Sequence, residues 1–172
     1  MTDFEIRPAQ PQDIPHLLRL IQGLAEFESL THLYENTPQR MHAALFGPHP
    51  SGEALLVWPQ NDADAPPVAF ALFFQNLSTF LGKPGIYLED IYVEPARRGL
   101  GIGRRLLEFI AAIAVERDCG RFEWAVLDWN VGAQRFYERL GATVLPDWRI
   151  TRITGEALYR LAGKNVHQER DD

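Results

Sequence analysis

The chain has 172 residues, of which 46% are hydrophobic and 23% charged, as in a globular domain. Its net charge of −6 argues against a nucleic-acid-binding protein and suits a cationic small substrate. The single cysteine, Cys119, rules out an intrachain disulfide and fits a reducing compartment. Because no signal-like or membrane-spanning run is found, we expect one cytoplasmic domain over residues 1–172, with no membrane partner and a polar tail at 163–172.

Apolar residues alternate, or recur at helical spacing, along most of the chain. Strands are predicted at residues 4–7, 54–58, 68–74, 86–93 and 122–127. Helices are predicted at 14–25, at 38–45 after the cap Thr37, at 106–114, and from the cap Asn130 to 140. Two terminal strands, 148–153 and 157–161, are expected to join near Gly155, and 76–85 to form a loop. This order predicts a mixed α/β fold whose sheet is covered on both faces.

The segment "VEPARRGLGIGRRLLEF" sets glycines at every second position between a strand and a helix: Gly99, Gly101 and Gly103. Bare backbone N–H groups at a helix N-terminus form an anion site. A Walker A loop is excluded because two arginines follow Gly103, and the dinucleotide spacing G-x-G-x-x-G is not met either. A phosphate site of another kind and a flexible turn into a surface helix both remain as interpretations.

The segment does contain R-x-x-G-x-G at residues 98–103, which resembles the pyrophosphate-binding motif of the GCN5-related N-acetyltransferases. "YLEDIYVEPARRGLGIG" and "DWNVGAQRFYERLGA" resemble the diamine acetyltransferase (spermidine/spermine N-acetyltransferase) branch, and the likeness runs over about residues 6–161. The resemblance implies a single α/β domain with a central mixed, splayed β-sheet flanked by helices. It also implies acetyl-CoA as cosubstrate and a homodimer with the terminal strands at its interface.

Acetyl transfer to an amine requires a group that takes the proton of the amine and a proton donor for the departing thiolate. The resemblance places the base at Glu89 and the general acid at Tyr137. The cofactor contacts that it implies are Ile91, Tyr92, Val93, Arg97, Arg98, Gly99, Gly101, Ile102, Gly103, Arg104, Asn130, Phe136 and Tyr137. The substrate contacts that it implies are Glu28, Glu89, Asp90 and Trp148.

Read without the resemblance, the same residues have plainer explanations. Glu89 and Asp90 are consecutive in a strand, so they should point to opposite faces and can both be surface acids. Phe136 and Tyr137 can be core aromatics, and Asn130 a helix cap.

We therefore expect an acetyl-CoA-dependent N-acetyltransferase that acts on a primary amine of a small molecule: a diamine, a polyamine or a lysine-like amine. "NLSTFLGK" lacks the acidic residue that polyamine-acetylating relatives carry before "GK", which leaves the acceptor open. The alternatives are a catalytically silent acyl-CoA-binding module and a protein or peptide N-acetyltransferase. The five histidines are scattered, so no metal is expected.

Overall fold

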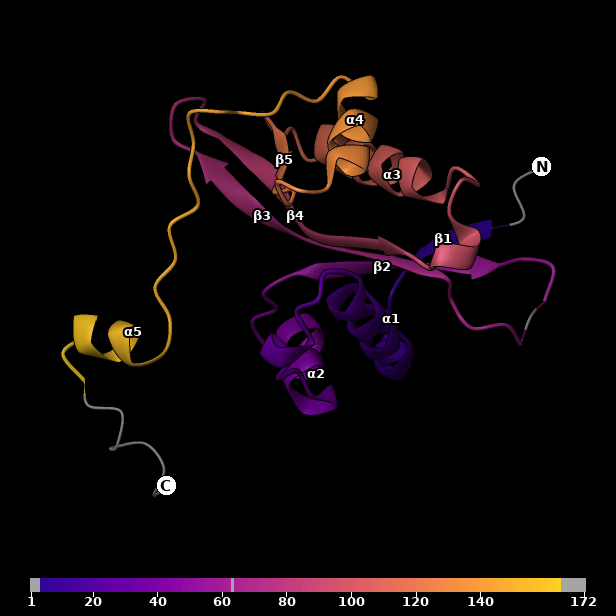
Figure 1. Ribbon diagram of the computed structural model, residues 1–172, viewed down its shortest axis with the longest axis horizontal. Helices are drawn as coiled ribbons and strands as arrows, with labels where there is room; N and C mark the ends of the chain where they lie inside the picture. Colours follow the sequence, from indigo (N-terminus) through magenta and orange to yellow (C-terminus); the bar gives the residue numbers. More distant parts are fainter. Residues whose placement is uncertain (1–3, 63, 165–172) are drawn as a thin grey trace. The chain divides into compact units, whose positions relative to one another are not determined.

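The computed structural model describes residues 4–62 and 64–164 (Figure 1). The chain forms two compact units, of which the first ends at Ala125 and the second begins at Val126.

The first unit is built on a five-stranded mixed sheet in the order β1-β2-β3-β4-β5. Its strands are β1 (Phe4–Pro8), β2 (Glu53–Pro59), β3 (Ala69–Ser78), β4 (Lys83–Val93) and β5 (Phe122–Trp124). Neighbours from β1 to β4 are antiparallel, whereas β5 runs parallel to β4 and pairs only with Ile86–Leu88. Beyond Leu88, β4 therefore continues past the end of its parallel neighbour, which is the arrangement expected of a splayed sheet.

Helices cover both faces of this sheet (Figure 1). On one face lie α1 (Ile14–Phe27) and α2 (Pro38–Phe46), and on the other α3 (Ile102–Glu116). The apolar stripe of α1 packs a fully buried Leu17 and Leu20 toward Phe70 of β3, and α3 buries Leu106 and Ile110. Each such side chain contributes about 1.5–3 kcal/mol through burial. The predicted fold class, a mixed α/β sheet flanked by helices, is confirmed.

The predicted helix caps are present as well. Thr37 accepts a hydrogen bond from the Arg40 backbone N at 3.2 Å and begins α2. In the second unit, Asn130 accepts from the Ala133 N at 3.2 Å and begins α4 (Val131–Arg139). The second unit also contains α5 (Gly155–Leu161). Three short 3₁₀ turns complete the described elements: Pro11–Asp13, Thr31–Leu33 and Pro95–Arg97.

Three predictions from the sequence are wrong. Residues 76–85 are not a loop, because β3 and β4 extend toward each other and pair up to Ser78 and Lys83, with a tight turn between them. The strand predicted at 122–127 ends at Trp124.

The third wrong prediction concerns the terminal strands. Residues 148–153 form no described strand, and 157–161 belong to α5, where Glu156 and Arg160 pair across one turn at 3.3 Å. Most of the predicted polar tail at 163–172 lies outside the described residues.

Candidate active site

Strand β4, between β3 and β5, carries a bulge at the predicted catalytic position. Leu72 of β3 pairs with Asp90, but the next residue, Phe73, pairs with Leu88, so Glu89 is the extra residue. Glu89 is exposed and Asp90 is half-buried. The expectation that these two carboxylates point to opposite faces assumes that side chains alternate strictly along the strand. A bulge interrupts that alternation, so the expectation does not hold at Glu89.

A third carboxylate, Glu28, acts on Asp90. Glu28 directly follows the last residue of α1 and caps its C-terminal end, and burial raises its pKa. Burial, the charge of Glu89 and the charge of Glu28 together raise the pKa of Asp90 from 3.8 to about 6. The first unit thus assembles three residues from the sequence prediction, Glu28, Glu89 and Asp90, into one group. A cation bound beside Asp90 would offset the repulsion that Glu89 and Glu28 exert on it.

The glycine segment forms a turn that leads into α3. Gly99 and Gly101 have φ of +81° and +79°, and Gly101 caps the helix. A Cβ at either residue would meet nothing within 4 Å, so the backbone conformation, and not crowding, calls for glycine. Ile102, Gly103 and Arg104 begin the helix, where the N–H groups and the dipole favour an anion.

The basic residues around this turn differ in their partners. Arg104 Nε donates to Glu108 at 2.7 Å on the surface of α3, and Arg97 ends the 3₁₀ turn Pro95–Arg97. Arg98 Nε donates to the Val93 carbonyl at 3.0 Å. The Arg98 guanidinium carbon also lies 4.4 Å above the ring centre of Phe27 and 5.7 Å from that of Tyr92.

The part of β4 beyond its pairing with β5 includes Ile91, Tyr92 and Val93. Tyr92 is buried with its ring centre 6.5 Å from that of Phe70, so its side chain belongs to the core. Ile91 and Val93 are half-buried. The buried Tyr92 side chain is therefore not available to an extended ligand, and its backbone groups are what it can offer.

In the second unit, α4 holds the other predicted catalytic residue. Tyr137 is half-buried, with its ring centre 5.3 Å from that of Phe136. Gln134 Nε2 donates to the carbonyls of Leu127 at 3.3 Å and Asp128 at 3.0 Å, which fixes the turn before the Asn130 cap. Trp148, predicted to contact substrate, is 74% exposed.

Sequence reasoning missed two residues, one in each unit. Phe27 stacks on Arg98, and Gln134 braces the turn before α4. The available signal for Phe27 was an aromatic side chain at the end of an amphipathic helix, directly before Glu28. Nothing in the sequence linked it to an arginine 71 positions later.

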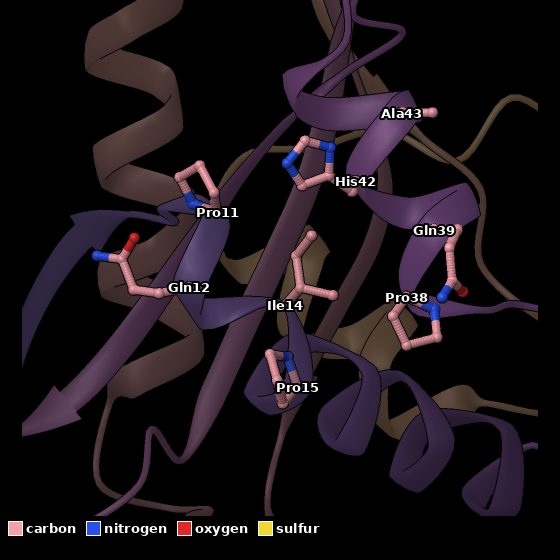
Figure 2. Close-up of a pocket in the computed structure, with 8 residues that line it drawn as sticks. All are labelled: Pro11, Gln12, Ile14, Pro15, Pro38, Gln39, His42 and Ala43. Atoms are coloured by element: carbon pink, nitrogen blue, oxygen red, sulfur yellow. The ribbon is translucent and has the colours of Figure 1, made fainter.

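An open pocket of about 540 Å³ lies elsewhere in the first unit, between the start of α1 and α2 (Figure 2). Pro11, Pro15, Pro38 and His42 are among the residues that line it. It contains none of the predicted site residues.

Within residues 4–62 and 64–164, no group of three or more His, Cys, Asp or Glu side chains is arranged to hold a metal ion. In the same ranges, no helix is both long and apolar enough to cross a membrane.

Comparison with known proteins identifies the fold. The model of the acetyltransferase (GNAT) family matches residues 19–142, and the chain belongs to this family. GNAT acetyltransferases use acetyl-CoA, and this chain is accordingly an N-acetyltransferase. The resemblance stated from the sequence is confirmed.

Its relatives act on amines. The chain is 34% identical to L-ornithine N5-acetyltransferase NATA1 of Arabidopsis thaliana, over 94% of this chain and 89% of the relative. It is 37% identical to thialysine N-epsilon-acetyltransferase of Sus scrofa, over 95% and 100%. An integron cassette protein of V. cholerae has the same fold, with a TM-score of 0.77 at 21% identity, over 94% of this chain and 99% of that one.

Proposed function

We propose that this protein transfers the acetyl group of acetyl-CoA to a side-chain or terminal primary amine of a short diamino compound, such as ornithine, a lysine analogue or a small diamine. The observation that carries the proposal is the group formed by Glu28, Glu89 and Asp90, with the pKa of Asp90 raised to about 6. An ammonium group bound beside Asp90 would offset the negative charges that Glu89 and Glu28 exert on it. The printed names of the ornithine and thialysine acetyltransferases support the same class of acceptor.

In this proposal, Glu89 removes the proton that the amine carries on arrival, directly or through a water molecule. An alkyl ammonium has a pKa of about 10.4, so at neutral pH the amine must lose a proton before it can attack. Asp90 and Glu28 hold the substrate through its positive charge, and Trp148 contributes an apolar contact. The position of Glu89 in the bulge, exposed beside the half-buried Asp90, supports this division of roles.

The amine nitrogen then attacks the thioester carbonyl, a C–N bond forms and the C–S bond breaks. The attacking nitrogen loses its second proton to water as it becomes an amide. Tyr137 gives its phenolic proton to the departing sulfur, which would otherwise leave as a thiolate with a pKa of about 8.5. Water then returns a proton to Tyr137. The place of Tyr137 on a capped helix, half-buried and packed beside Phe136, supports a fixed orientation of the phenol.

The donor is proposed to bind along β4 and at the glycine turn, and no metal takes part. Backbone groups of Ile91, Tyr92 and Val93 would pair with the pantetheine arm, because this stretch of β4 lies beyond its pairing with β5. The residues proposed to hold the pyrophosphate and the rest of the nucleotide are Arg97, Arg98, Gly99, Gly101, Ile102, Gly103, Arg104, Asn130 and Phe136.

The acceptor is expected to be short. The β3–β4 turn, Thr79–Gly82, carries no carboxylate, and Asp147 is the one acid between Gly141 and Trp148. Spermine carries several ammonium groups and would find few carboxylates beyond the central three. Ornithine and thialysine carry fewer ammonium groups and therefore need fewer carboxylates.

A thiol-detection assay of CoA release tests the proposal on ornithine, thialysine, lysine, putrescine, spermidine and spermine. We expect kcat/KM to be highest for the short diamino compounds, and Tyr137→Phe to lower kcat while leaving CoA affinity within about two-fold of wild type. Tyr159→Phe on α5 is the matched control and should behave as wild type. Turnover with spermine above all others would overturn the acceptor class. Binding of CoA without turnover of any amine would overturn the activity.

We also propose that the protein is a cytoplasmic homodimer. Large apolar side chains of the second unit are strongly exposed, among them Trp148, Ile150 and Leu161 at 73–74%. A second copy that covers them would remove this surface from water. Light scattering at micromolar concentration that finds only monomer would exclude the dimer, and fractionation of cells would test the compartment.

A further inference from the structure

Phe27 and Arg98 are held together across the first unit. Phe27 is the last residue of α1, and Arg98 lies between β4 and the glycine turn. The guanidinium carbon is 4.4 Å above the ring centre of Phe27, within the distance at which a cation is attracted to the face of an aromatic ring.

Arg98 has two further contacts that fix its position. Its Nε donates to the Val93 carbonyl at 3.0 Å, and its guanidinium carbon lies 5.7 Å from the ring centre of Tyr92. The contacts with Phe27 and Tyr92 involve one face of each ring, and the hydrogen bond to Val93 uses only the Nε–H group of Arg98. The N–H groups on the two terminal nitrogens are not needed for any of them.

Arg98 and Arg104 also differ in whether a carboxylate forms an ion pair with them. Arg104 is paired with Glu108 at 2.7 Å. No carboxylate among the residues that the structure describes forms an ion pair with Arg98. An arginine held by ring faces and a carbonyl keeps its full positive charge for an anion, and it stands directly before Gly99 and the N-terminus of α3.

We propose that Phe27 is the positioning residue for Arg98: its ring holds the guanidinium beside the glycine turn, in the orientation that contacts the pyrophosphate of the acetyl donor. The inference rests on the proposed function, because it requires a donor that carries a pyrophosphate. The end of α1 then serves both substrates, because Phe27 supports the donor and the next residue, Glu28, belongs to the acidic group.

Comparing two donors separates positioning from a general structural role. CoA contains the pyrophosphate, whereas acetyl-pantetheine has the same thioester arm without it. In Phe27→Leu the ring is lost but apolar volume is kept. We expect CoA to bind about three- to ten-fold more weakly by calorimetry. The kcat/KM for acetyl-pantetheine should stay at the wild-type value.

Three further variants complete the test. Phe27→Tyr keeps a ring face and should bind CoA within about two-fold of wild type. Arg98→Gln should weaken CoA binding by itself, and the addition of Phe27→Leu to it should cause no further loss, because Phe27 acts through Arg98. Trp58→Leu removes another ring that lies under an arginine, 4.2 Å from Arg7, and should leave CoA affinity unchanged.

The results that would contradict the positioning role differ from those that would contradict the proposed function. If wild type binds CoA but Phe27→Leu binds it equally well, or if the losses from Phe27→Leu and Arg98→Gln add, the positioning role is wrong and the proposed function stands. An equal loss with acetyl-pantetheine also overturns the positioning role. If Phe27→Leu does not fold, Phe27→Tyr takes its place in the test. A ten-fold loss of CoA affinity in Phe27→Tyr would then also overturn the positioning role. If wild type binds no CoA, both proposals are wrong.

Discussion

Glu89 and Asp90 are consecutive in β4, yet only Asp90 has a Cα partner in β3, where it pairs with Leu72. The unpaired Glu89 lies next to a carboxylate whose pKa is raised to about 6, and its charge is one of the causes. This arrangement keeps two acidic groups together at the point where β4 leaves its parallel neighbour. The negative charge of Glu89 therefore opposes the ionisation of Asp90 in the folded protein.

Asp90→Asn should make the protein more stable at neutral pH. The pKa of Asp90 is about 6 in the folded state and about 3.8 when unfolded, so the folded state binds more protons between these values. The wild type therefore loses stability as the pH rises from about 4 to about 6, whereas the amide has nothing to ionise. We expect a gain of about 1–2 kcal/mol in the free energy of unfolding at pH 7, and none below pH 4.

Urea unfolding of both proteins at pH 4 and pH 7 measures this difference. Asp118→Asn is the control, since Asp118 is exposed and pairs with Lys83 at 2.6 Å on the surface. If the role proposed for Asp90 holds, the more stable variant should also have a higher KM for the amine. Equal stability of Asp90→Asn and wild type at pH 7 would show that the ionisation of Asp90 is not opposed in the folded protein.

Gly101→Ala should weaken CoA binding through the backbone. Gly101 has φ +79°, where an alanine is strained by about 1–2 kcal/mol, and it begins α3 at the proposed pyrophosphate site. Gly82→Ala is the matched control. Gly82 has φ +63° in the β3–β4 turn and equally open surroundings.

Thermal unfolding and CoA calorimetry on the two glycine variants give the result. Both should lose similar stability, but only Gly101→Ala should lose CoA affinity. A similar loss of affinity in Gly82→Ala would mean that general destabilisation, and not the shape of the glycine turn, is responsible.

Gly23→Ala should loosen the packing of α1 on β4. A Cβ at Gly23 would stand 2.8 Å from the Tyr92 hydroxyl oxygen and 3.1 Å from the ring. Because Tyr92 is buried, it has little room to withdraw, and we expect a loss of about 1–3 kcal/mol of stability in chemical unfolding. Tyr92→Phe removes the closest atom and should restore part of the loss when combined with Gly23→Ala. No rescue in the double variant would place the clash elsewhere.

Local signals in the sequence predicted elements of both units. Thr37 and Asn130 begin their helices as their side chains require, because a cap needs only its own chain neighbours. Gly99 and Gly101 adopt positive φ for the same local reason. The glycine turn could therefore be predicted from local sequence, whereas Glu28, Glu89 and Asp90 were implied by the family resemblance.

The wrong predictions depended on partners that are distant in sequence. Residues 148–153 alternate like a strand, but a strand needs another to satisfy its backbone, and in the described structure they pair with none. The bulge at Glu89 is a property of the pairing with β3 and cannot be read from β4 alone. The raised pKa of Asp90 needs Glu28, which α1 supplies from a distant part of the chain.

The short β5 has one more consequence, for handling the protein. On the side of β5, β4 is paired with a described strand only up to Leu88, and a strand edge of this kind can join an extended segment of another molecule. The bulge and the charge of Glu89 oppose such self-association. A donor bound along this edge would add to that protection, so we expect the empty protein to aggregate more readily than the loaded one during concentration and storage.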